Sequence, residues 1–274
     1  MLHTQPPDGT ESGTWNSDAK DLPETQLLLN SLFQDHAVFQ KGASIPVWGK
    51  AAPNRRICCS LGGVSSVAVS NAEGRFFLRL PPLEAGGPFE LKIRQLPDGT
   101  ERILHDVWIG EVYLASGQSN MELTAGRVTD KFAEEIARDE NPMIRYVKIP
   151  LGNDLHGPKD DLPGADWMSL TKETAPSFSA LAYFFAKEMY RETQVPVGIV
   201  NSSWGGSSVE AWMSEEALQK FPRQLHERDL FNSDEYRELC NRSGQMMNRF
   251  WDTALYKGDR GLHDGICWNR PELD

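Results

Sequence analysis

A single serine stands where an apolar stretch of the chain gives way to small polar residues. Residues 112–115 are apolar and β-prone, and Gly117, Ser119 and Asn120 follow within five positions. A serine at the sharp turn between a core strand and a helix can present its hydroxyl as a nucleophile. Gly117 permits such a turn because it has no Cβ. The alternative is a serine that only caps the turn, since small polar residues are typical of turns.

A second apolar strand ends in a similar polar loop. Residues 196–200 favour a short buried strand, and residues 201–206, which include Gly205 and Gly206, follow it. The segment 179–191 lies between the two loops and predicts an amphipathic helix, with Leu181 and Phe185 among the apolar residues at helical spacing. A strand–helix–strand order with polar loops at the strand ends is typical of α/β proteins.

The region before these loops has a different pattern. Between residues 25 and 107, short alternating runs are separated by turn residues at intervals of about ten. This spacing predicts an antiparallel β-sandwich, followed by an α/β domain over residues 108–250. Residues 1–24 are polar and lack an apolar leader segment, which predicts a disordered tail. Residues 251–274 show neither a helical nor a strand period.

Composition excludes several classes of partner. The net charge of −11 disfavours nucleic acids and anionic membranes, and no apolar run reaches the roughly 20 residues of a membrane-spanning helix. The four cysteines lack metal-type spacing, and thiols are favoured over disulfides. We expect neither a metal nor an organic cofactor. The sequence as written predicts a cytoplasmic protein, whereas a removed leader would imply a lysosomal, secreted or periplasmic one. The oligomeric state is not predicted.

Several motifs together resemble one family. Residues 116–121 read Ser-Gly-Gln-Ser-Asn-Met, and residues 201–212 contain Trp-Gly-Gly. With the segments 32–40, 106–111 and 178–185, in the same order, they resemble the sialate O-acetylesterase family, a branch of the SGNH (GDSL-like) hydrolases. The likeness extends over about residues 26–255. It implies an incomplete SGNH-type, flavodoxin-like α/β core behind the β-sandwich.

The resemblance implies a role for each residue of the two loops. Ser119 would be the nucleophile, and its N–H would form part of the oxyanion hole. Gly205 or Gly206 would supply a second N–H, since a residue without a side chain lets an acyl oxygen approach closely. The alternative for the glycines is an ordinary left-handed turn. Gln118 and Asn120 would bind substrate or brace the turn.

Two motifs of that family are missing from this sequence. One is a Trp-x-Gln-Gly-Glu segment, and the other is the Asp-x-x-His segment that supplies the base. His263 is preceded by Asp259 at a different spacing, and we expect it to be a surface residue. The resemblance therefore predicts the N-terminal portion of a longer esterase, with residues 251–274 as the start of an inserted β-domain or a disordered end.

These observations lead to three hypotheses about function. The first is a serine esterase that removes O-acetyl groups from sialic acids through an acetyl-enzyme, with its His and Asp in downstream sequence. The second is an inactive carbohydrate-binding or interaction module, because a serine without a base is a poor nucleophile. The third is an acetylesterase that acts on other polysaccharides, since the motifs do not discriminate between sugars.

Overall fold

The computed structural model describes most of the chain, in two compact units. One unit comprises residues Met1–Leu151 and Lys159–Ser207, and the other comprises Gly152–Pro158 and Ser208–Asp274. The described residues are 27–97, 99–152, 157, 159, 161–162 and 164–258. The predicted tail, His263 and most of the segment 251–274 lie outside them.

The strands predicted in the first third of the chain are present. A sheet of β1 (Leu28–Leu29), β3 (Ile45–Lys50) and β6 (Arg75–Leu80) is antiparallel, and a second sheet contains β4 (Arg56–Leu61), β5 (Val64–Val69) and β7 (Gly86–Leu96). Inward-facing side chains of both sheets, such as Val47 and Ile93, join one apolar cluster. This cluster reflects the alternation of apolar and polar residues along each strand.

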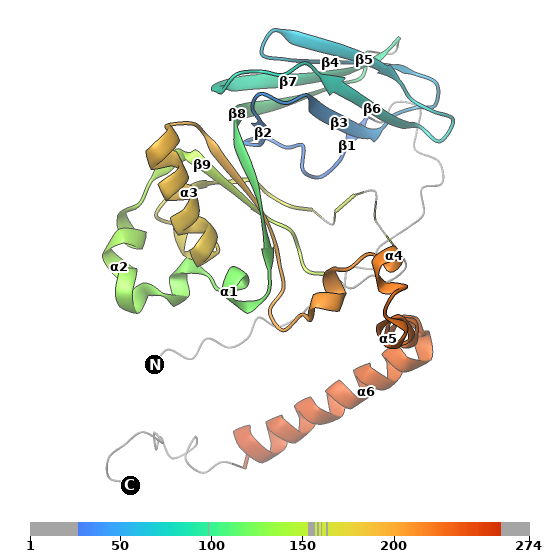
Figure 1. The fold of residues 1–274 in the computed structure, drawn as a ribbon, viewed down its shortest axis with the longest axis vertical. Coiled ribbons are helices and arrows are strands. Elements are labelled where there is room, and N and C mark those ends of the chain that lie inside the picture. Colours follow the sequence, from blue (N-terminus) through green and yellow to red (C-terminus); the bar gives the residue numbers. More distant parts are fainter. Residues whose placement is uncertain are drawn as a thin grey trace. The chain divides into compact units, whose positions relative to one another are not determined.

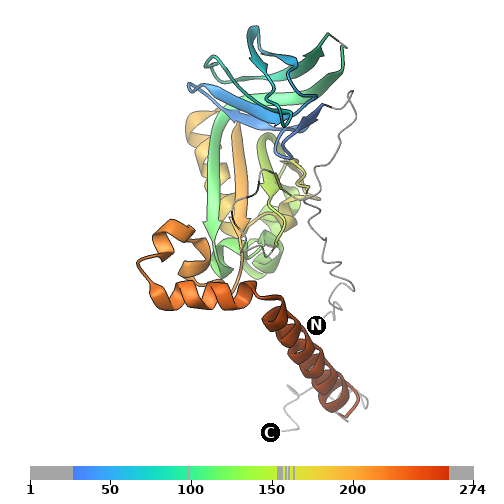
Figure 2. The same cartoon turned by 90° about the vertical axis from the view of Figure 1, so that its right-hand side faces the viewer.

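The strand that leads to Ser119 is longer than the sequence predicted. β8 (Glu101–Gly117) pairs antiparallel with β7 through its first half. It then pairs parallel with β2 (Val38–Gln40) and, from Glu111 onward, with β11 (Val197–Ser203). The predicted domain boundary between residues 107 and 108 therefore falls inside one continuous strand, which Figures 1 and 2 show running between the two parts of this unit.

The α/β part follows this strand, and the predicted mixed α/β fold is confirmed. β9 (Asn141–Lys148) lies parallel to β11 on the side away from β8, and β10 (Met168–Leu170) pairs antiparallel with β9. Helix α2 (Thr129–Arg138) and helix α3 (Ala180–Thr193) contribute to an apolar cluster on one face of this sheet (Figure 1). Val38 and Trp167 belong to the cluster on its other face.

Helix α3 is present as predicted, but the prediction of which side chains it buries is wrong in part. Leu181 and Phe185 are 53% and 43% exposed, whereas Ala182, Tyr183 and Ala186 are buried. The helix approaches the sheet closely through its small residues. The exposed ring of Phe185 packs edge to face on the ring of Tyr113, with the ring centroids 4.9 Å apart.

A buried arginine joins β9 to β8. Arg145 on β9 has a side chain only 3% exposed, and its guanidinium donates to Asp106 Oδ2 at 2.8 Å. The same carboxylate contacts His36 Nδ1 at 2.7 Å and accepts the Trp108 indole N–H at 2.8 Å. Partial burial raises the pKa of Asp106, but these hydrogen bonds outweigh it and hold the pKa below its ordinary value.

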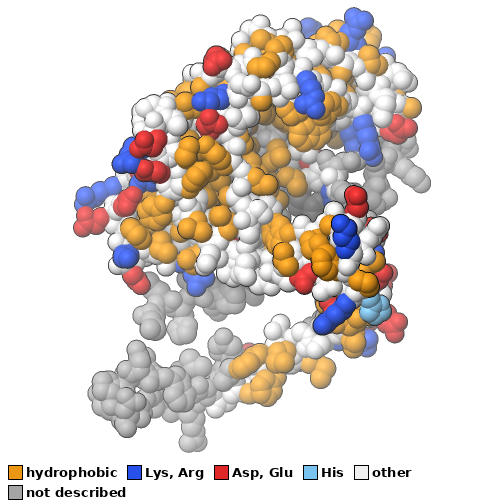
Figure 3. All heavy atoms as spheres, viewed as in Figure 1, with side chains coloured by type: hydrophobic (Ala, Val, Ile, Leu, Met, Phe, Trp, Pro, Cys, Tyr) orange, Lys and Arg blue, Asp and Glu red, His pale blue; other side chains and the backbone are white. Residues whose placement is uncertain are grey.

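The second unit is helical where the structure describes it. It contains α4 (Glu215–Leu218), α5 (Pro222–Asn232) and α6 (Asp234–Trp251), and Ser214 caps α4 by accepting the Ala217 N–H. Asp252–Tyr256 continues α6 as a π-helical turn, where the sequence predicted no regular element. Side chains of α6 such as Met246 and Phe250 are exposed and form an apolar surface on this helix (Figure 3). Among the described residues, no helix has the length and apolar character needed to cross a membrane.

Replacing Asp106 by Asn tests the junction between β8 and β9. The variant leaves the buried Arg145 guanidinium without a counter-charge, so we expect the unfolding free energy to fall by about 3 kcal/mol. This value is the lower end of the range for breaking a buried ion pair, because Asp106 is partly exposed. Folding lowers the pKa of Asp106. The extra unfolding free energy of the wild type over the variant is therefore complete above pH about 4 and is lost as the pH falls further. Urea unfolding followed by tryptophan fluorescence measures both effects, with the exposed Asp166→Asn as control.

Candidate active site

Ser119 opens a one-turn helix immediately after β8. Helix α1 (Ser119–Glu122) begins after Gly117, whose φ of 147° is accessible to a residue without a Cβ. The Gln118 side chain braces the turn, because its Oε1 accepts the Ser119 N–H at 2.8 Å and the Ser119 hydroxyl at 2.5 Å. Ser119 is exposed, so its hydroxyl is accessible from solvent.

The parallel pairing of β8 and β11 places the second loop beside this turn. Ser203 lies opposite Gly117 in the register, and the Trp204 N–H donates to the Gly117 carbonyl at 2.9 Å. The next residue, Gly205, lies against Ser119, since a Cβ added to it would be 3.6 Å from Ser119 Oγ. The structure therefore brings the two predicted loops together.

Glu122 places a carboxylate at this site. Its Oε2 accepts the Gly205 N–H, and a Cβ on Gly205 would lie only 2.6 Å from that oxygen. Ser119 and Glu122 are three residues apart on one helical turn, so their side chains lie on the same face. Sequence reasoning did not find this contact, because its partners are separated by 83 residues.

A partly buried lysine holds the end of β11. Lys148 Nζ donates to Asn201 Oδ1 at 2.9 Å, to Ser203 O at 2.9 Å and to Ser203 Oγ at 2.8 Å. Both acceptor residues are buried. Burial lowers the pKa of Lys148, and the negative charge of Glu122 partly opposes that shift. The ammonium thus fixes the strand from which the Gly205 loop emerges.

The remaining predicted site residues are placed as follows. Gly206 has a φ of 79°, which a glycine adopts without strain, and its N–H has no acceptor within the described part of the chain. Asn120 is exposed on α1. Among the described residues, no histidine hydrogen-bonds to Ser119 Oγ, whose partner is Gln118. The assignments of nucleophile and oxyanion donor remain predictions.

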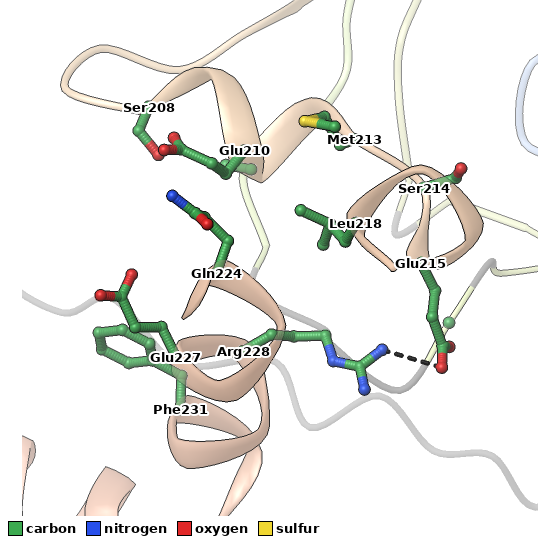
Figure 4. A pocket seen from close by; sticks show the side chains of 12 residues that line it. Ser208, Glu210, Met213, Ser214, Glu215, Leu218, Gln224, Glu227, Arg228 and Phe231 are labelled. Atoms are coloured by element: carbon green, nitrogen blue, oxygen red, sulfur yellow. Dashed lines mark ion pairs between the residues drawn. The ribbon is translucent and has the colours of Figure 1, made fainter. Parts of the chain in front are cut away.

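A separate pocket of about 630 Å³ lies in the second unit (Figure 4). Its lining includes Glu210, Glu227 and Phe231, together with the ion pair between Arg228 and Glu215. None of the predicted site residues lines it. In the described ranges, no group of three or more His, Cys, Asp or Glu side chains is placed to hold a metal ion.

Comparison with known proteins agrees with the motifs of the two loops. A family model described as carbohydrate esterase, sialic acid-specific acetylesterase, matches residues 109–256. The rat sialate O-acetylesterase is 30% identical over 206 residues, which are 69% of this chain and 38% of that protein. The human protein is 29% identical, with coverage of 69% and 39%. The chain thus spans less than two fifths of these relatives.

A solved structure shares the fold. The crystal structure of a carbohydrate acetylesterase from Xanthomonas citri is 37% identical in sequence and superposes with a TM-score of 0.67. The similarity covers 72% of this chain and 45% of the other.

Replacing Lys148 by Met tests the support beneath the loop. The variant keeps the length of the side chain but leaves the carbonyl and hydroxyl oxygens of buried Ser203 without the Lys148 donor, while Asn201 Oδ1 still accepts the Ser203 hydroxyl. Each unsatisfied group costs about 1–3 kcal/mol, and we expect the unfolding free energy to fall by about 3 kcal/mol in urea titrations. Lys131→Met, at an exposed position of α2, is the matched control and should change stability by less than about 0.5 kcal/mol.

Proposed function

The chain belongs to the sialic acid-specific acetylesterase family of carbohydrate esterases, and on this basis we propose that it is a serine O-acetylesterase with Ser119 as nucleophile. The observation that carries the proposal is the approach of the Gly205 loop to Ser119. An exposed hydroxyl with backbone N–H groups around it is the arrangement that acyl transfer requires.

In the proposed reaction, Ser119 Oγ attacks the carbonyl carbon of an acetyl ester. A base takes the hydroxyl proton, and the tetrahedral intermediate places its negative oxygen against the Ser119 N–H and a glycine N–H of the second loop. The sugar oxygen then leaves with that proton. Water hydrolyses the acetyl-enzyme, releasing acetate and restoring the serine.

The base in this proposal is a histidine outside the described residues. The histidines at positions 36 and 105 contact Asp106 and Glu90, respectively, and neither contacts Ser119. The Asp-x-x-His motif of the resembling family is absent from this sequence. We also propose that residues 25–107 form an antiparallel β-sandwich beside an SGNH-type, flavodoxin-like core, which the apolar cluster shared by the two sheets supports.

We propose an O-acetylated sialic acid as the substrate, because the matching family and the mammalian relatives carry that name. An acetylated polysaccharide is the alternative, supported by the broader description of the Xanthomonas citri enzyme. A binding module without turnover is the second candidate function, and the observation that favours it is the absence of a histidine beside Ser119 among the described residues.

The Ser119→Ala variant tests the nucleophile. Loss of the attacking hydroxyl should lower kcat/KM by about 10³-fold or more, as removal of a nucleophile does in serine hydrolases. The measurement is acetate release from 4-nitrophenyl acetate, 9-O-acetylated sialic acid and an acetylated xylan by this chain extended through the downstream segment that carries the proposed histidine. Ser65→Ala, at an exposed position of β5, is the control and should match the wild type.

The three hypotheses give different results in this assay. Serine-dependent release from the sialic acid supports the proposed substrate, whereas release from xylan alone supports the polysaccharide. Saturable binding of either glycan without any release would favour the binding module. Equal turnover by wild type and Ser119→Ala would remove Ser119 from the mechanism.

A further inference from the structure

The contact between Glu122 and Gly205 bears on which glycine faces the substrate. Sequence reasoning left Gly205 and Gly206 as alternative oxyanion donors. A backbone N–H carries one hydrogen. That of Ser119 is donated to the neutral amide oxygen of Gln118, which a negatively charged oxygen can replace, whereas that of Gly205 is donated to the Glu122 carboxylate. The Gly206 N–H has no acceptor within the described part of the chain.

We propose that Glu122 is a positioning residue that holds Gly205 against Ser119 and leaves Gly206 as the loop glycine whose N–H faces the acyl oxygen. This inference rests on the proposed function of Ser119. It adds a role for Glu122, which neither the motif nor the composition of the loops predicted.

Glu122 contacts the Gly205 loop directly. Its carboxylate and the Ser119 hydroxyl both lie close to Gly205, as the distances of 2.6 Å and 3.6 Å from a Cβ built there show. A hydrogen bond to an ionised acceptor is stronger than one between neutral groups. Glu122 is also on the same short helix as Ser119, so a displacement of that helix would move both groups together.

Charge explains why the carboxylate holds the loop without taking part in the reaction. If Gly205 donated to the reacting oxygen, the Glu122 carboxylate would remain beside a second negative charge. Lys148, the cation that interacts with Glu122, already donates to three acceptors on Asn201 and Ser203. The Lys148 ammonium therefore stabilises the Glu122 carboxylate and not the oxyanion.

The test compares Glu122→Ala with Glu122→Gln in the same extended chain, which carries the proposed histidine. Glutamine retains an oxygen that accepts the Gly205 N–H, whereas alanine does not. We expect kcat for 4-nitrophenyl acetate to fall about 10²-fold in the alanine variant with little change in KM, and to recover to within about threefold in the glutamine variant. Glu134→Ala, at an exposed position of α2, is the control.

A double-mutant cycle with Gly205→Ala tests whether the two residues act through one contact. The added methyl group would displace the Glu122 carboxylate, so the single variants and the double variant should lose activity to the same extent. Unchanged or higher kcat in Glu122→Ala would overturn the proposal, because it would mean that the carboxylate blocks a donor. Equal losses in the alanine and glutamine variants, or additive losses in the cycle, would overturn it as well.

A measurement without turnover separates this inference from the proposed function. With ¹⁵N-glycine labelling, the Gly205 amide resonance is identified by its loss in Gly205→Ala. Its hydrogen exchange should accelerate about tenfold or more in Glu122→Ala and stay near the wild-type rate in Glu122→Gln. Absence of any Ser119-dependent acetate release would refute the esterase function, and the exchange rates would then decide by themselves whether Glu122 holds Gly205.

Discussion

The rest of the candidate site depends on the continuity of β8. One strand is antiparallel to β7 in its first half and parallel to β11 in its second, so the two sheet regions of this unit share a backbone. Since parallel strands end at the same edge, the pairing with β11 sets the second loop beside Ser119. The Asp106–Arg145 ion pair lies where β8 changes partners and ties β9 to the same strand.

Two groups of opposite charge, Glu122 and Lys148, support the two loops. Glu122 accepts a backbone N–H, and Lys148 interacts with Glu122 and fixes the end of β11. One oxyanion donor is worth about 3 kcal/mol to an acyl transfer. Two negative charges about 4 Å apart repel by about 4 kcal/mol at an effective dielectric constant of about 20. A Gly205 N–H shared with Glu122 would therefore bring the oxyanion no net stabilisation.

The sequence was sufficient to predict the elements that depend on local pattern. Alternation located the strands of the first third of the chain, and the change from apolar to small polar residues located the Ser119 turn. The buried face of α3 was not predictable in this way, because small Ala182 and Ala186 pack against the sheet while larger Leu181 stays exposed. Helical periodicity ranks residues by hydrophobicity, whereas close packing also selects for size.

Long-range polar contacts were the other features that local pattern could not predict. In the sequence alone, Glu122 is one of many acidic residues, and Lys148 is a basic residue at the end of a strand, where a solvent-exposed side chain is expected. Only the parallel register of β8 and β11 gives these side chains partners in a loop far away in sequence. The motif predicts a candidate nucleophile, but the groups that orient its surroundings depend on strand pairing. A family resemblance therefore assigns the reaction more readily than it assigns the residues that hold the reacting geometry in place.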